Sequence, residues 1–384
     1  MRTFTTMVRG ITVVAIATLV GGASALAATF VYVSNADDGD IGMYRLLETG
    51  EMQPGARVRA ASVVMPMAVS PDRRFLYAAS RSKPYRVHVY TIAKDTGALT
   101  SLSASPLAES FPYISLDRTG RFLFGASYGG HLVSVNAVDT DGRVAIEPLQ
   151  VIPVGRNAHS IRVDASNRFV YVPTLGTDQI FQFTFDAKTG KLSSNTPAVF
   201  LTSAMTGPRH FITSNDNKFA YVLSELLGTV TTFAIDGKTG QLSQVSSASG
   251  LPADTKHGPG APRGAVGVPG GPPPRNTDND VWAADIHMTP NGKFLYVSER
   301  TSSSIGAFAA DGASGKLTFL SSTSTERQPR GFAIDAKGRY MVVTGEKSDT
   351  ISVYAIDQAS GGLKFLNKYP TGKGSNWVEI VSFD

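Results

Sequence analysis

Four side chains of this sequence have the chemistry needed to cleave an ester: His159, Arg209, Glu225 and Arg300. At neutral pH such a reaction needs a base that activates water, an acid for the leaving oxygen, and positive charge for the developing oxyanion. Glu225 or His159 can act as base and acid, while Arg209 and Arg300 can hold a substrate carboxylate or stabilise the oxyanion. These residues lie far apart in the sequence, so only the tertiary fold can bring them together.

An internal repeat supplies the elements that would position them. The central segment of each repeat consists of an apolar strand, a Gly/Asn/Asp turn and a basic-aromatic strand. Residues 70–77 and 289–296 are two examples. An alternating strand follows, such as 351–356, and a turn of the type Thr-Gly-x-Leu, such as 96–99, leads into a further strand. This chemistry predicts four strands per repeat.

One aromatic or apolar position can be aligned in every repeat. It is occupied by Tyr32, Tyr77, Phe124, Tyr171, Tyr221, Tyr296 and Val342. A spacing of about 45 residues per four-stranded unit is typical of a β-propeller blade. One interval is longer because it contains a Gly/Pro-rich insertion at residues 249–280, which we interpret as a loop. No Trp-Asp blade ending recurs, so the pattern is not that of a WD40 array.

The two ends of the chain complement each other. Residues 30–33 match the second strand of a repeat, and the missing first strand appears at residues 377–381. Closing a ring in this way removes the exposed sheet edges of an open array. We therefore predict an all-β, seven-bladed propeller over residues 28–384, closed by pairing the N- and C-terminal strands in one blade.

Counting from the aligned position identifies residues that should face the propeller axis. The register at the start of the first strand of each blade reads Met65, Pro112, His159, Arg209, Ala284, Arg330 and Asn376. A second register at the end of the second strand reads Ala36, Arg81, Tyr128, Leu175, Glu225, Arg300 and Glu346. Antiparallel pairing places both registers on the same rim.

The two registers predict one polar pocket. Its charged and histidine members are His159, Arg209, Glu225, Arg300, Arg330, Arg81 and Glu346. The positive excess favours an anion or an oxyanion as ligand. The alternative is a set of salt bridges that stabilise the ring, as Arg209 and Glu225 could form within one blade. Beyond the four catalytic candidates, we assign substrate binding to Arg330, Arg81, His287, Asp285 and Glu346.

The N-terminus predicts export from a bacterial cell. Arg2 and Arg9 precede an apolar run at residues 11–20, and a small-residue cleavage site follows at 25–27. The run is short for a membrane span, so we expect a signal peptide over 1–27, no stable span after cleavage, and a periplasmic or secreted location. An uncleaved N-terminal anchor is the alternative. The chain of 384 residues has no cysteine, so its core must form without disulfides.

Three other patterns that could suggest catalysis or metal binding have simpler interpretations. The Gly-x-Ser-x-Gly run at 125–129 lacks the helix that a nucleophile elbow requires, because residues 131–135 continue as a strand. Residues 37–40 are acidic but lack calcium-loop spacing, which favours a solvated turn. Asp285 and His287 share one strand face, where we favour a hydrogen-bonded pair over a metal site. The formal charge of +5 is scattered without a basic stripe, which argues against nucleic acid as a partner.

Several runs of the sequence resemble the lactonase family of seven-bladed propellers, which includes 6-phosphogluconolactonase and carboxymuconate cyclase. The matching runs are Ala158-His159-Ser160, Gly207-Pro208-Arg209-His210, Ser224-Glu225-Leu226, Trp282-Ala283-Ala284-Asp285-Ile286-His287, Ser298-Glu299-Arg300-Thr301, Gln328-Pro329-Arg330-Gly331-Phe332 and Gly374-Ser375-Asn376-Trp377-Val378. The resemblance implies an active site of one His, one Glu and two Arg, which fall on His159, Glu225, Arg209 and Arg300. The predicted export signal departs from cytosolic sugar-phosphate enzymes.

Two classes of function follow from these observations. The first is a monomeric hydrolase that opens a sugar-acid or related lactone without metal or cofactor, or a muconate-type cyclase that runs the related lactonisation. The second is a non-catalytic propeller that binds a ligand or protein outside the cytoplasm. The insertion at 249–280 enters the sixth blade on the rim of Arg209 and Glu225, so we interpret it as a pocket cover, with a plain surface loop as the alternative.

Overall fold

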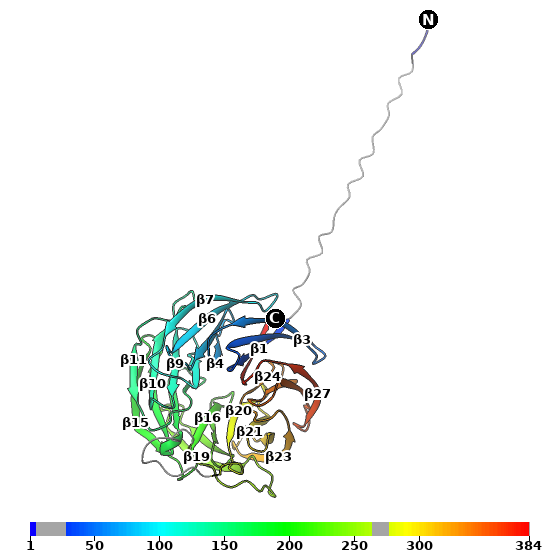
Figure 1. Ribbon diagram of the computed structural model, residues 1–384. Coiled ribbons are helices and arrows are strands. Elements are labelled where there is room, and N and C mark those ends of the chain that lie inside the picture. Colours follow the sequence, from blue (N-terminus) through cyan, green and yellow to red (C-terminus); the bar gives the residue numbers. More distant parts are fainter. Residues whose placement is uncertain (5–27, 263–275, 384) are drawn as a thin grey trace.

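Seven four-stranded antiparallel sheets surround a central axis, as Figure 1 shows. This arrangement confirms the predicted all-β, seven-bladed propeller. The computed structural model describes residues 1–4, 28–262 and 276–383. Residues 5–27 of the predicted signal peptide and 263–275 of the predicted insertion lie outside the described residues.

We number the blades in chain order, with the strand nearest the axis given first. Blade 1 contains β28 (Ser375–Phe383), β1 (Ala28–Asn35), β2 (Asp40–Leu46) and β3 (Met52–Arg59). Blade 2 contains β4 (Val64–Val69), β5 (Phe75–Ser80), β6 (Arg86–Ile92) and β7 (Leu99–Pro106). Blade 3 contains β8 (Tyr113–Leu116), β9 (Phe122–Ser127), β10 (Leu132–Ala137) and β11 (Gln150–Pro153).

The remaining blades follow the same order. Blade 4 contains β12 (Arg162–Val163), β13 (Phe169–Thr174), β14 (Gln179–Asp186) and β15 (Lys191–Leu201), with the 3-10 turn η1 (Leu175–Thr177) after β13. Blade 5 contains β16 (Pro208–Thr213), β17 (Phe219–Ser224), β18 (Thr229–Ile235) and β19 (Leu242–Ser249). Blade 6 contains β20 (Ala283–Met288), β21 (Phe294–Glu299), β22 (Ser304–Ala310) and β23 (Leu317–Ser324). Blade 7 contains β24 (Phe332–Ile334), β25 (Tyr340–Thr344), β26 (Thr350–Ile356) and β27 (Leu363–Pro370).

The repeated sequence phrases explain how neighbouring blades attach. The Tyr32 hydroxyl of blade 1 donates to the carbonyl of Gly97 in blade 2 at 2.7 Å, and Tyr171 of blade 4 donates to Gly240 of blade 5 at 2.7 Å. Gly97 has φ +70°, and a Cβ there would lie 2.3 Å from the Phe30 ring. The Thr-Gly-x-Leu turn therefore needs glycine for its backbone and for close contact with the preceding blade.

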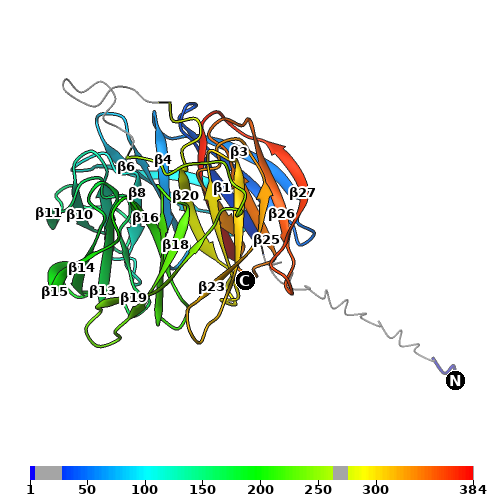
Figure 2. The same ribbon diagram turned by 90° about the horizontal axis from the view of Figure 1, so that it is seen from below.

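Ring closure occurs as predicted in blade 1. Strand β1 pairs antiparallel with β28, with Ala28 opposite Phe383 and Val33 opposite Val378. Trp377, Val378 and Val381 of β28 are buried in the cores between blades. The innermost strands begin on one side of the ring, the first rim, and end on the other, the second rim, where the chain terminates (Figure 2). In the described ranges, the structure has no helix with the length and apolar character needed to cross a membrane.

Some innermost strands contain β-bulges near the first rim. In β16 the pairing shifts between Pro208 and Phe211, and in β20 it shifts between Ala283 and Ile286. A bulge places an extra residue in one strand and changes the direction of neighbouring side chains. The simple alternation of strand faces is therefore interrupted where Arg209 leaves the sheet for the axis.

Candidate active site

Glu225 is the centre of a buried ionic network near the first rim. Its Oε2 accepts from Arg209 Nε at 2.6 Å and from Arg300 Nη2 at 3.1 Å. Its Oε1 accepts from the indole Nε1 of Trp282 at 3.2 Å. We call His159, Arg209, Glu225, Trp282 and Arg300 the Glu225 cluster. The two predicted registers thus bring residues of blades 4, 5 and 6 together.

Trp282 is a member of this cluster that sequence reasoning did not assign. The Arg300 guanidinium lies over its ring, 3.7 Å from the ring centroid, and Arg300 Nε donates to its backbone carbonyl at 3.0 Å. Stacking and hydrogen bonding together restrain the planar arginine. Trp282 directly precedes the innermost strand of blade 6 in one of the runs that carry the family resemblance, and that position was the available signal.

Three described residues of the predicted pocket carry a buried polar atom without a hydrogen-bond partner. Among the described residues, His159 Nδ1, Arg209 Nη2 and Arg330 Nη1 are buried and have no hydrogen-bond partner. His159 lies close enough to Arg209 and Arg330 for both charges to affect its ionisation. Buried polar groups normally find partners, and these three atoms, from blades 4, 5 and 7, are among eight without one in the part of the chain that the structure describes.

The predicted base and the arginines have distinct charge states. Burial, followed by the charges of Arg209, His210 and Arg330, lowers the pKa of His159 well below its ordinary value. Burial also lowers the pKa of Arg209 to about 10 and that of Arg330 to about 9. At pH 7 the imidazole is therefore neutral and both guanidinium groups remain charged.

Arg330, Arg81 and Glu346 extend the charged site across blades 7 and 2. Arg330 Nε lies 3.5 Å from Glu346 Oε1. Burial lowers the pKa of Arg81, and the negative charge of Glu346 partly opposes this lowering. Arg81 donates to Ser110 Oγ at 3.1 Å. The structure thus places these three predicted substrate-binding residues near the Glu225 cluster.

Asp285 and His287 occupy a different part of the axis. Asp285 accepts from His210 Nδ1 at 2.9 Å and lies 3.2 Å from His287 Nε2, so the expected pair exists and includes a third residue. His210 contacts Tyr113 and Trp377 edge-on or tilted, with ring centroids 4.9 and 6.1 Å apart. We call Tyr113, His210 and Trp377 the aromatic layer. Asp285 contacts this layer through His210, and His287 contacts Asp285 and, edge-on, the ring of Phe332, with centroids 4.8 Å apart.

The weaker motifs behave as simple structural elements. Ser127 ends β9, and its hydroxyl donates to the Ser110 carbonyl at 3.0 Å, with strand β10 beginning at Leu132. In the acidic turn, Arg57 lies 2.6 Å from carboxylates of both Asp38 and Asp40. Within the described ranges, no group of three His, Asp or Glu side chains is arranged to hold a metal ion.

The described ends of the 249–280 insertion lie beside the cluster. Gly260 N donates to the carbonyl of Leu226, the residue after Glu225, at 2.8 Å. Val281 N, next to Trp282, donates to Gly258 O at 2.8 Å. Four residues of the cluster have at most 6% of their surface exposed: His159, Arg209, Glu225 and Arg300. These contacts are consistent with the insertion as a pocket cover, which stays a prediction.

The neutral state of His159 predicts an effect on stability. The unfolded chain takes up a proton at this residue below about pH 6.5, whereas the folded protein does not, so wild type loses stability as the pH falls. His159→Gln removes this contribution. Between pH 6.5 and 5.5, the variant should lose about 1 kcal/mol less of its free energy of unfolding than wild type. Urea unfolding at both pH values measures this, and equal losses would show that His159 is charged in the folded protein.

Comparison with known proteins agrees with this geometry. A family model described as "Lactonase, 7-bladed beta-propeller" matches residues 25–380. The chain is 38% identical to a 6-phosphogluconolactonase of Serratia proteamaculans, over 92% of this chain and 98% of the relative. It is 36% identical to a 6-phosphogluconolactonase of Yersinia pestis, over 91% of this chain and 97% of the relative.

Solved structures include a similar propeller. The periplasmic gluconolactonase of Pseudomonas aeruginosa superposes with a TM-score of 0.80 at 27% identity, covering 92% of this chain and 99% of that chain. The match therefore extends over nearly the whole ring, including all the blades that contribute to the Glu225 cluster. On this evidence the chain belongs to the lactonase family of seven-bladed β-propellers.

Proposed function

We propose that this protein is an exported lactonase that opens a sugar-acid or related lactone by water attack. The observation that carries the proposal is the set of unpartnered buried atoms on His159, Arg209 and Arg330 beside Glu225. A lactone presents a carbonyl oxygen that becomes negative during attack, and two unpartnered guanidinium N–H groups suit that oxygen. A neutral imidazole suits the attacking water.

The reaction can be assigned to these groups in two steps. His159 accepts a proton from water as the water oxygen attacks the lactone carbonyl, while Arg209 Nη2 and Arg330 Nη1 donate to the developing oxyanion. When the tetrahedral intermediate collapses, the bond to the ring oxygen breaks and protonated His159 returns a proton to that oxygen. The products are a hydroxyl group and a carboxylic acid, so atoms and protons balance without a cofactor.

Glu225 has a positioning role in this scheme. Both of its oxygens already accept hydrogen bonds from Arg209, Arg300 and Trp282, so we assign it to holding the cluster together and not to activating water. Its negative charge offsets two buried arginines and orients Arg209 towards the ligand site. Arg300, held flat on Trp282, remains available for a substrate carboxylate or phosphate at the edge of the site.

The relatives and the N-terminus favour a sugar-acid lactone outside the cytoplasm. The similar sequences are named 6-phosphogluconolactonases, and the similar structure is named a periplasmic gluconolactonase. Residues 1–27 have the basic, apolar and small-residue order of a cleaved signal peptide. An unphosphorylated aldonolactone fits both the lactone chemistry of these relatives and a location outside the cytoplasm.

A lactone panel tests the proposal. Full-length protein is incubated with glucono-1,5-lactone, other sugar lactones and muconolactones, and acid release is followed at constant pH by titration with base. We expect hydrolysis of at least one sugar lactone well above the buffer rate. No rate above buffer for any member would support the non-catalytic binding propeller instead. Turnover of muconolactones alone would support the cyclase-type activity.

A further inference from the structure

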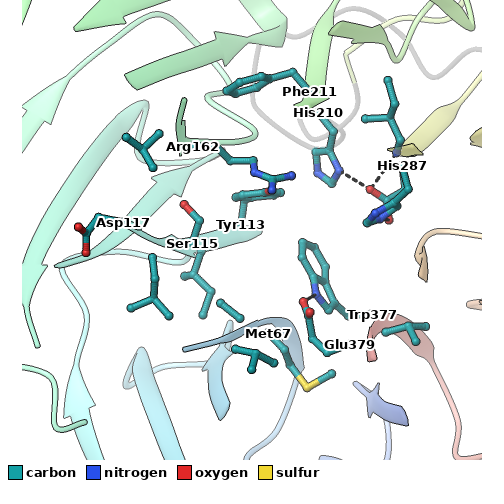
Figure 3. Close-up of a pocket in the computed structure, with 18 of the residues that line it drawn as sticks. Met67, Tyr113, Ser115, Asp117, Arg162, His210, Phe211, His287, Trp377 and Glu379 are labelled. Atoms are coloured by element: carbon teal, nitrogen blue, oxygen red, sulfur yellow. Dashed lines mark hydrogen bonds and ion pairs between the residues drawn. The ribbon is translucent and has the colours of Figure 1, made fainter. Parts of the chain in front are cut away.

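A cavity opens at the end of the propeller axis opposite the Glu225 cluster. It has a volume of about 360 Å³ and is lined by innermost strands of blades 1 to 6. Its polar and aromatic lining includes Tyr113, Arg162, His210, His287, Trp377 and Glu379, which Figure 3 shows converging on a common space. No residue of the Glu225 cluster lines it among the described residues. We call this space the opposite cavity.

The aromatic layer divides this cavity from the Glu225 cluster. Tyr113 and Trp377 pack edge-on with centroids 5.5 Å apart, and His210 contacts both rings. His159 lies on the far side of the layer, where its ring is 5.2 Å from that of His210. From the layer the lining continues towards the second rim, through Leu116 and the turn residue Pro71.

The charged groups of the cavity occupy one register of the propeller. Arg162 pairs with Tyr171, His287 with Tyr296 and Glu379 with Tyr32 across the two inner strands of their blades. Each therefore lies directly opposite an aligned aromatic position, three residues beyond the register of His159 and Arg209. Arg162, His287 and Glu379 therefore lie at the same level of the propeller axis.

Arg162 provides a cation that no carboxylate neutralises at ion-pair distance among the described residues. Its positive charge acts on Tyr113 and on Glu379, and it lowers the pKa of both against the dominant raising by burial. A planar guanidinium with free donors matches the two oxygens of a carboxylate. A phosphate dianion suits the cavity less well, because Asp285 and Glu379 add negative charge.

The other polar groups suit hydroxyls. His210 is 2% exposed, yet its Nε2 has no partner among the described residues, while its Nδ1 is bound to Asp285. Glu379 Oε1 accepts from the indole of Trp377 at 2.9 Å. Burial raises the pKa of Glu379 to about 7, so near neutrality this carboxyl can donate as well as accept.

We propose that the opposite cavity binds a small hydroxylated carboxylate, such as a sugar acid, at a site separate from the Glu225 cluster. The carboxylate pairs with Arg162, hydroxyls bond to His210, His287 and Glu379, and the C–H face of the molecule packs on Trp377 and Tyr113. A concave site with aromatic surface and a few convergent polar groups is the usual form of a small-molecule site. The inference does not depend on catalysis at Glu225.

Calorimetric titration of the full-length protein with sodium gluconate tests the site. We expect saturable binding by wild type, weakened at least 10-fold by Arg162→Gln because the charge-assisted pair is lost. Acetate, which has no hydroxyls, and glucose, which has no carboxylate, should each bind more weakly. Glu379→Ala serves as a second variant and should also weaken gluconate binding, should Arg162→Gln fail to fold.

Two control variants locate the binding. Arg156→Gln changes an exposed cation of blade 4 that does not line the cavity, where Arg156 donates to the Gly176 carbonyl at 3.1 Å, and should leave affinity nearly unchanged. Glu225→Gln alters the Glu225 cluster, so gluconate binding that persists in this variant and is lost in Arg162→Gln belongs to the opposite cavity. No binding by folded wild type would overturn the inference. So would binding that Glu225→Gln abolishes and Arg162→Gln preserves, because gluconate would then occupy the Glu225 cluster alone.

Discussion

Glu225→Gln should reduce kcat/KM for lactone hydrolysis by about 10²-fold or more while the ring remains folded. The amide keeps the shape of the carboxylate but removes its charge, so Arg209 and Arg300 lose their shared counter-ion in a site that is nearly inaccessible to water. A buried cation that loses its counter-ion either changes position or lowers the free energy of unfolding of the protein. Steady-state rates by titration of released acid give the effect, and circular dichroism with thermal unfolding confirms the fold.

The matched variant His159→Gln distinguishes a base from a positioning residue. Loss of a base should lower kcat with little change in KM, whereas loss of the group that orients Arg209 should change both parameters. Full activity of Glu225→Gln in a protein that hydrolyses lactones would contradict the assignment of the site. A loss of kcat alone in Glu225→Gln, with both parameters changed in His159→Gln, would instead make Glu225 the better candidate for the base.

Removal of residues 377–384 should prevent closure of the ring. The truncated chain loses most of the β28–β1 pairing and leaves the inner edge of β1 unpaired, where other chains can associate. It also loses Trp377 and Val378, which are 9% and 4% exposed in the interblade cores. A loss of more than about 5 kcal/mol is expected from these side chains and strands together. Differential scanning calorimetry and size-exclusion chromatography should therefore show a much lower melting temperature or aggregation.

A substitution in the full-length chain separates closure from a general effect of truncation. Val378→Asp introduces a charge into the core between blades 1 and 7 and should destabilise strongly. Lys364→Asp, on the exposed face of the outermost strand β27, should have little effect. Unchanged unfolding of both the truncated protein and Val378→Asp would show that the terminal strands do not hold the ring together.

The sequence by itself determined the blade architecture and most of the Glu225 cluster. Each blade repeats the same turn and aromatic chemistry, so the aligned positions could be counted without any structure. Counting then identified His159, Arg209, Glu225 and Arg300 on one rim, because strand pairing is local and periodic within a blade. Closure by residues 377–381 was also predictable, since an incomplete repeat at one end had its complement at the other.

Only the tertiary structure decided which of these side chains are partners. The β16 bulge directs Arg209 to Glu225 and the adjacent His210 to Asp285, which strict alternation of strand faces does not predict. The stacking of Arg300 on Trp282 depends on packing between the innermost strand of blade 6 and the loop before it.

The division of the axis into two sites was likewise absent from the sequence pattern. Asp285 and His287 were grouped with the residues of the first rim, but the aromatic layer places them in the opposite cavity with Arg162 and Glu379. Repeat periodicity specifies the level of a residue within its own blade. Aromatic side chains fill the axis at one level, and a cavity remains at the next. This difference depends on how side chains from six blades pack at the axis, so it arises only in the closed propeller.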